Sequence, residues 1–124
     1  MFFRGSSNWL KGVLATAACA VALSALTGCR PLPPSKAEAL FTPEEARGKQ
    51  VYQAYCARCH YPTTTHGLKG PGLQALTKVK AMPSGAPPTD ERILATIQHG
   101  RGMMQPVAVP DDELRDLLAY LHSL

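Results

Sequence analysis

Two cysteines and a histidine stand together in the stretch Cys56-Ala57-Arg58-Cys59-His60, near the middle of a 124-residue chain. Two thiols separated by only two residues can hold a metal ion, form a redox-active disulfide or attach a covalent cofactor. Tyr55 and His66 lie close by in the sequence and add further side chains that could take part. The choice between these chemistries depends on which partner residues the rest of the chain supplies.

Two of the three chemistries lack such partners. A structural zinc site has four ligands, commonly two pairs of cysteine or histidine, and only His66 or His99 remains to complete one here. A thioredoxin-like dithiol stands near a βαβ pattern, but no β-type alternation of any useful length occurs in this sequence. A zinc site and a redox dithiol are therefore less well supported by the sequence than a covalently attached cofactor.

The spacing C-x-x-C-H is the attachment sequence of a c-type haem. The two thiols add to the two vinyl groups on one edge of the ring, and the histidine that follows directly binds the iron from one face. We therefore expect one covalent haem c, held through Cys56 and Cys59, with His60 as an iron ligand.

The N-terminus has the pattern of an export signal. Arg4 and Lys11 precede an almost wholly apolar run from Val13 to Leu26. As a helix these residues would extend only ~21 Å, short of the ~30 Å hydrocarbon core of a membrane. A basic start, a short apolar run and small residues are typical of a signal peptide, which plays no part in the fold.

The signal ends in Leu26-Thr27-Gly28-Cys29, which resembles the bacterial lipobox. The resemblance implies that residues 1–28 are a lipoprotein signal peptide, removed on export, and that Cys29 is lipidated. More than one acyl chain anchors a protein stably to a membrane. We therefore expect a protein of the bacterial cell envelope, lipid-anchored on the periplasmic side.

Charge excludes one class of partner. Without Arg4 and Lys11, 11 basic residues stand against 9 acidic ones, a net charge of +2. The basic residues are dispersed and do not combine with aromatic residues into a patch typical of nucleic-acid binding. Nucleic acid is therefore not an expected partner.

The mature chain divides into a tether and one domain. Residues 29–41 contain the lipidated cysteine and the Pro-rich segment "RPLPPSKAEA", whose prolines favour an extended polyproline conformation. Residues 42–124 form the domain, which starts with the capping box of Thr42 and Glu45 and with Pro43 in the first helical position.

Three helices are expected in the domain. The first continues to Ala57 and carries Gly48, Tyr52 and Tyr55 on one side, where Gly48 would allow close approach of another helix. The others are predicted from Thr89 to Gln98 and over "DDELRDLLAYLHSL", which has an apolar stripe at helical spacing. A short helical turn is expected over residues 73–80. Few large apolar residues lie between the helices, which indicates that a cofactor fills the centre.

From Thr42 to Leu124 the sequence resembles a small class I cytochrome c. "GKQVYQAYCARCH" resembles the first helix of that family, "GPGL" its G-P-x-L motif, "IQHGRGMM" the approach to its sixth ligand and "LLAYL" its last helix. The resemblance implies an all-α fold of about three to four helices packed around one covalently bound haem.

The resemblance also implies roles for individual residues. His60 is the proximal ligand, and the carbonyl of Pro71 accepts a hydrogen bond from its Nδ1–H. The sixth ligand is expected to be Met104, with Met103 as the alternative, because neither methionine of "GMMQP" directly precedes the proline. Met82-Pro83 shows that dipeptide but precedes the second expected helix, so we interpret Met82 as a packing residue.

These features predict a monomeric one-electron carrier that is not itself an enzyme and takes no small-molecule substrate. Its partners would be redox proteins, toward which scattered basic residues could provide steering; these are Arg58, Lys69, Lys78, Lys80 and Arg101. Two alternatives stay open: the haem c subunit of a larger dehydrogenase or oxidase, and a five-coordinate haem sensor or enzyme.

Overall fold

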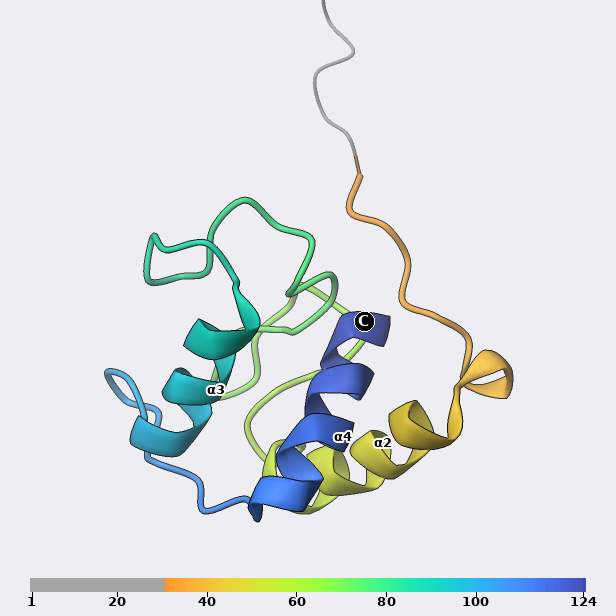
Figure 1. The fold of residues 1–124 in the computed structure, drawn as a ribbon. Helices are drawn as coiled ribbons and strands as arrows, with labels where there is room; N and C mark the ends of the chain where they lie inside the picture. The colour runs from red at the N-terminus through yellow and green to blue at the C-terminus, as the bar shows by residue number, and fades with distance from the viewer. Residues whose placement is uncertain (1–30) are drawn as a thin grey trace, which may run out of the picture. The chain divides into compact units, whose positions relative to one another are not determined.

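The computed structural model describes residues 31–124 (Figure 1). The expected signal peptide and Cys29 lie outside the described residues. Within residues 31–124, no helix is both long and apolar enough to span a membrane.

Three α-helices form the framework. They are α2 (Pro43–Tyr55), α3 (Asp90–His99) and α4 (Asp111–Ser123), preceded by a short 3₁₀ turn, η1 (Glu38–Leu40). Helices α2 and α4 cross and pack extensively, and α3 lies against α4 (Figure 1). The described residues contain no β-strand, only an isolated bridge between Arg101 and Met104. The all-α prediction is confirmed.

Helix α2 begins as the sequence predicts. The hydroxyl of Thr42 accepts a hydrogen bond from the Glu45 amide at 3.2 Å, and the Glu45 carboxylate accepts one from the Thr42 amide at 2.7 Å. The helix ends at Tyr55 rather than at the predicted Ala57. The chain turns there because the amides of both Cys56 and Ala57 donate to the carbonyl of Tyr52.

The crossing of α2 and α4 depends on a missing side chain. Gly48 is buried, and a Cβ at this position would lie 2.8 Å from the Cβ of Tyr120 and closer still to the backbone of Asp116. Beside this contact, the guanidinium of Arg47 binds the Asp116 carboxylate at 2.6 and 3.0 Å. The predicted close approach at Gly48 is confirmed, although Tyr55 on the same helix is exposed.

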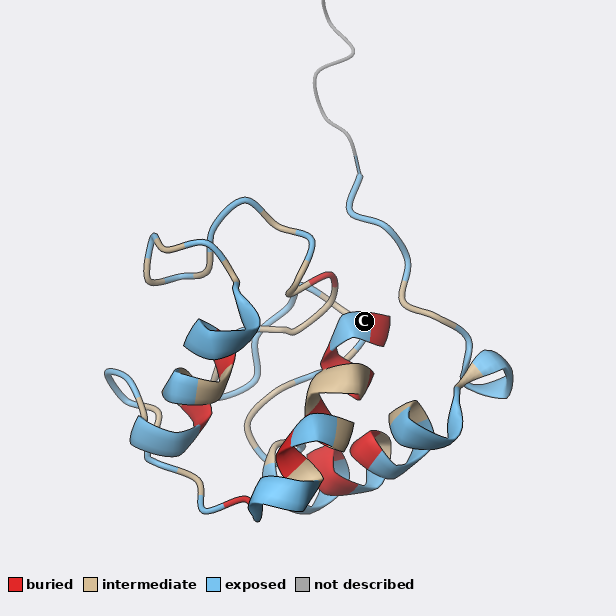
Figure 2. Cartoon of the chain, viewed as in Figure 1, coloured by how far each residue is buried: buried red, intermediate tan, exposed pale blue. Residues whose placement is uncertain are grey.

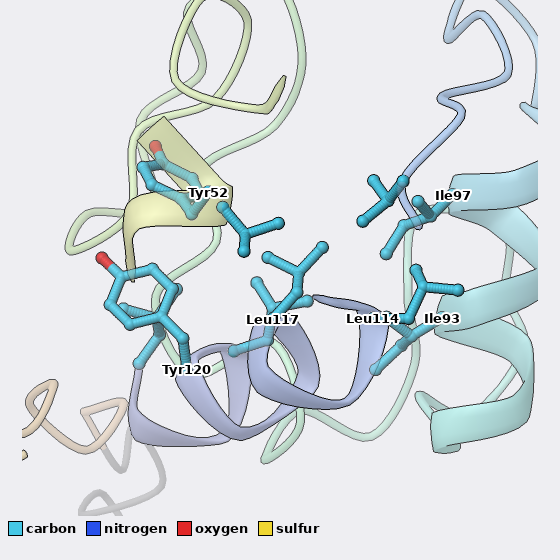
Figure 3. Close-up of a cluster of buried hydrophobic side chains, with 10 residues drawn as sticks. Tyr52, Ile93, Ile97, Leu114, Leu117 and Tyr120 are labelled. Atoms are coloured by element: carbon cyan, nitrogen blue, oxygen red, sulfur yellow. The ribbon is translucent and has the colours of Figure 1, made fainter. Parts of the chain in front are cut away.

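The core lies where the three helices meet (Figure 2). Leu117 of α4 is fully buried at its centre, Leu114 lies near α3, and Tyr52 and Tyr120 have ring centroids 5.3 Å apart (Figure 3). Apolar burial of this kind contributes about 1.5–3 kcal/mol for each large side chain. Packing in this core fixes the orientation of α2 and therefore the position of the residues that follow the helix.

The segment from Leu73 to Lys80 differs from its prediction. It forms a series of turns instead of a short helix. Ala75 is fully buried and has φ = 55°, in the left-handed region that a right-handed helix does not use. A helix cannot continue through this residue, and the segment instead crosses the core as a series of turns.

Candidate haem site

The two cysteines lie in a tight turn directly after α2. Cys56 is the C-terminal cap of the helix, and its carbonyl accepts hydrogen bonds from the amides of Cys59 at 3.0 Å and His60 at 3.1 Å. Both thiols are half-buried and are not joined in a disulfide. The hydroxyl of Tyr52 donates to the carbonyl of His60, which ties the end of the turn back to the helix. The turn therefore holds both thiols and the imidazole on one short segment.

The imidazole of His60 is oriented by a backbone carbonyl. Its Nδ1 lies 2.7 Å from the carbonyl oxygen of Pro71, the contact that the sequence resemblance implies. Because a carbonyl only accepts, Nδ1 carries the proton and the lone pair of Nε2 is left for a metal. A metal-bound histidine commonly has such a partner, which fixes the ring and raises its basicity.

Gly70 provides the space for that ring. A Cβ on Gly70 would lie 2.9 Å from both ring nitrogens of His60, too close for any real side chain. The Gly70 amide also donates to the carbonyl of Cys59 at 2.8 Å. The "GPGL" motif alone does not predict this role of Gly70, because the contact depends on how the loop folds back over His60.

The environment of Cys56 does not suit a redox dithiol. Burial raises the pKa of the Cys56 thiol to about 11, and the neighbouring Cys59 adds to the effect. A reactive dithiol instead needs a thiolate that is stabilised at neutral pH. Cys56 also packs against the hydrophobic core. The site therefore favours covalent attachment over thiol exchange.

The two neighbouring methionines face different surroundings. The amide of Arg101 donates to the carbonyl of Met104 at 2.9 Å, and the reverse bond is 3.0 Å, which closes a tight turn. Gly102 in this turn has φ = 57°, a conformation that favours glycine. Met103 is 91% exposed at the tip, whereas Met104 is half-buried and packs against the core, as Met82 does.

Comparison with known proteins agrees with this arrangement. The family model described as cytochrome C oxidase, cbb3-type, subunit III matches residues 43–121, more than half of the chain. The chain belongs to this family. No curated protein matches it. The cbb3-type domain is a small class I cytochrome c, as the resemblance implied, and membership implies a covalently bound haem c and a role in electron transfer.

His66 and His99, the two histidines that could have completed a zinc site, do not build a competing site. His66 is exposed, and its amide donates to the Thr64 hydroxyl. His99 is exposed on the last turn of α3. Within residues 31–124, no three His, Cys, Asp or Glu side chains are grouped to hold a metal ion. The described residues therefore form no zinc site of the usual kind.

The residues present fit a haem. Two free thiols and an imidazole with an available Nε2 form the donor set on one side. A second set consists of apolar side chains that pack against the core but are only half-buried by protein; these are Leu73, Leu76, Met82, Leu94, Met104 and Val107. Half-covered apolar side chains at the edge of a small core suit contact with a large, mostly apolar ring. The sequence had indicated this by its shortage of large core residues.

Proposed function

We propose that the cbb3-type domain is a one-electron carrier whose single haem c is attached through Cys56 and Cys59, and that His60 and Met104 are the residues that would bind its iron. The observation that carries this proposal is the 2.7 Å contact between His60 Nδ1 and the Pro71 carbonyl, which leaves Nε2 for iron. When bound, the haem supplies reversible one-electron transfer between its ferrous and ferric states.

Residues of the chain would orient the proposed iron ligands and leave no coordination position open. The Pro71 carbonyl and the space left by Gly70 hold the His60 ring in one orientation. Met104 is half-buried against the core whereas Met103 is exposed, which favours Met104 as the second residue that would bind the iron; a methionine ligand would raise the reduction potential. Two protein ligands leave no open position for a substrate, which supports a carrier rather than an enzyme or sensor.

Spectra of methionine variants test the ligand assignment. Ferric His/Met haem has a weak red absorption band that depends on the methionine sulfur. Met104→Ala should lose this band, while Met103→Ala and Met82→Ala, the matched controls, should keep it. Rapid CO binding to the unmutated reduced protein would contradict the carrier, because it would show an open coordination position.

We further propose that Cys29 is lipidated and holds the carrier on the periplasmic side of a bacterial membrane. The support is the lipobox-like sequence Leu26-Thr27-Gly28-Cys29 directly after the apolar run. Membrane extraction followed by intact mass measurement tests this, and a chain that starts elsewhere without acyl groups would contradict it.

The family description supports a second form of the proposal, in which the domain is the haem c subunit of a larger oxidase. Its partners would then be redox proteins of the same complex. All five basic residues expected to steer a partner are exposed, although the ammonium of Lys78 also donates to the Leu124 carbonyl oxygen at 2.9 Å. Co-purification of other subunits from gently solubilised membranes separates a subunit from a free shuttle.

A further inference from the structure

The Pro-rich segment contacts the domain at specific positions, although most of its residues are exposed. The sequence predicts an extended tether, but the carbonyl of Pro33 accepts a hydrogen bond from the Gln74 amide side chain at 3.3 Å. Three residues later, the amide of Lys36 donates to the carbonyl of Ser123 at 2.7 Å. We call residues 33–41 the N-terminal strap. It therefore contacts the turns before α3 and the last residues of α4.

Side chains reinforce these backbone contacts. The ammonium of Lys36 lies 2.7 and 3.0 Å from the two carboxylate oxygens of Glu45, whose side chain is only 14% exposed. A second ion pair joins Glu38 to Lys49 at 2.5 Å. Exposed single pairs contribute little, but the Lys36–Glu45 pair is partly buried and shares its carboxylate with the capping box of α2.

The strap also ends in an aromatic contact. The ring of Phe41 meets the edge of Tyr120 with centroids 5.8 Å apart, and Phe41 packs against the core. An edge-to-face pair of this kind contributes about 0.5–1.5 kcal/mol beyond the area that it buries. The strap is thus connected at three separated points to α2, α4 and the turns after Pro71.

We propose that the N-terminal strap fixes the point where the chain leaves the domain and thereby holds the domain close to the lipid surface that anchors Cys29. This inference rests on the proposed lipid anchor. The strap contacts themselves lie wholly within residues 33–124 and do not depend on the anchor.

Binding of the strap shortens the distance that the domain can move away from the lipid surface. Thirteen residues from Cys29 to Thr42 in a free polyproline conformation would span ~40 Å at ~3.1 Å per residue. With the strap bound from Pro33, the chain between Pro33 and Cys29 is only four residues long, and a polyproline chain of that length spans at most ~12 Å. A domain held this close can meet a partner in the same membrane but cannot swing far from the surface. This geometry suits a subunit or a carrier between neighbouring membrane complexes.

Limited proteolysis of the full haem-containing protein tests the strap. Trypsin does not cut Arg30–Pro31, so Lys36–Ala37 is the first susceptible bond after Cys29. Cleavage there requires release of the strap, and protection reports the population of the bound form. We expect the bond to be cut at least tenfold more slowly than in a synthetic peptide of residues 30–41. Equal rates would overturn the proposal.

A matched pair of variants tests the ion pair between Lys36 and Glu45. Glu45→Gln removes the charge that binds Lys36 while glutamine still serves the capping box, so cleavage at Lys36 should become several-fold faster. Glu44→Gln makes the same change one residue away, on a carboxylate that faces Arg47 at 3.9 Å, and should leave the rate unchanged. A Glu45→Gln rate equal to that of the unmutated protein would also overturn the proposal.

Vesicles test the distance to the lipid. The purified protein is bound to phosphatidylcholine vesicles carrying dansyl-labelled phosphatidylethanolamine, and quenching of the label by haem is measured. Quenching should weaken in Glu45→Gln and not in Glu44→Gln; equal quenching in both would contradict the short reach. If intact mass shows no acyl groups, the lipid anchor fails, and with it the short reach to lipid, whereas the protease result still decides whether the strap is bound.

Discussion

Gly48 in α2 lies directly against the backbone of Asp116 in α4, with no room for even a methyl group between them. This contact brings the two helix axes close together at one point, and the Arg47–Asp116 ion pair lies beside it. Because Cys56 is the residue directly after α2, the helix crossing also sets the position of the thiols relative to the core. A small change at this glycine should therefore affect the whole domain.

Gly48→Ala should destabilise the domain by about 3 kcal/mol, the upper end of the usual cost of overpacking, despite the better helix propensity of alanine. The added Cβ meets backbone, which cannot rotate away. Chemical denaturation followed by circular dichroism measures the loss. Gln50→Ala, at an exposed position of the same helix, is the control and should change the free energy of unfolding by less than about 0.5 kcal/mol. A neutral Gly48→Ala would show that the helices do not meet there.

Gly70→Ala should disturb His60, the proposed iron ligand, more than the fold. The new methyl group overlaps the His60 ring, so the imidazole must rotate or lose its bond to Pro71. We expect shifted NMR resonances of the His60 ring in the reduced protein, together with a lower yield of haem-containing protein. Gly85→Ala is the control, since a Cβ there meets nothing within 4 Å and costs only backbone strain. Unchanged His60 resonances in Gly70→Ala would contradict this account of the site.

Tyr52→Phe removes the hydroxyl that donates to the His60 carbonyl. The ring stays in the core, so the loss should be that of one buried hydrogen bond, about 1 kcal/mol, plus the cost of an unpaired carbonyl. Thermal unfolding of the haem-containing protein measures it. Tyr55→Phe makes the same chemical change at an exposed position and should leave the melting temperature unaltered. Similar effects at both positions would mean that the hydroxyl of Tyr52 has no special role.

The strap should be released in acid. Burial of Glu45 raises its pKa, but hydrogen bonds from Lys36 and Thr42 outweigh this and hold the pKa below its ordinary value of 4.5. A carboxyl group whose pKa is lowered by folding stabilises the bound form above its ordinary pKa, and the effect is lost as pH falls through the lowered value.

The Lys36 amide proton in NMR spectra of the reduced protein should report this release, because it is hydrogen-bonded to Ser123. Its chemical shift should be constant above pH 5 and move toward the unfolded value in more acidic solution. Glu45→Gln should show no such transition. A shift that titrates identically in both proteins would assign the effect to another group.

Much of the framework could be predicted because its determinants are local. The capping box of Thr42 and Glu45 and the leucine stripe of α4 follow from residue spacing, and both are present. The C-x-x-C-H motif predicts for the same reason that the turn after α2 is where the haem is attached. The Pro71 contact to His60 was implied by family resemblance rather than by spacing, and the structure contains it.

Other features depend on contacts between distant residues, which a single sequence does not reveal. The fit of Gly70 over the His60 ring, the left-handed Ala75 and the strap contact between Lys36 and Ser123 are of this kind. The proline-rich composition predicts an extended chain but gives no sign that residues 33–41 contact the domain or that Glu38–Leu40 forms a 3₁₀ turn. The difference in exposure between Met103 and Met104, which supports the proposed choice between them, likewise depends on a turn that contains Gly102 at φ = 57°.

The central claim is that Cys56 and Cys59 hold one covalent haem. Intact mass spectrometry of the protein extracted from membranes, after denaturation to remove anything bound noncovalently, tests it most directly. The account predicts a chain carrying the mass of one haem, and predicts its loss when both cysteines are replaced by alanine. A denatured, unmutated chain that carries no haem would contradict it.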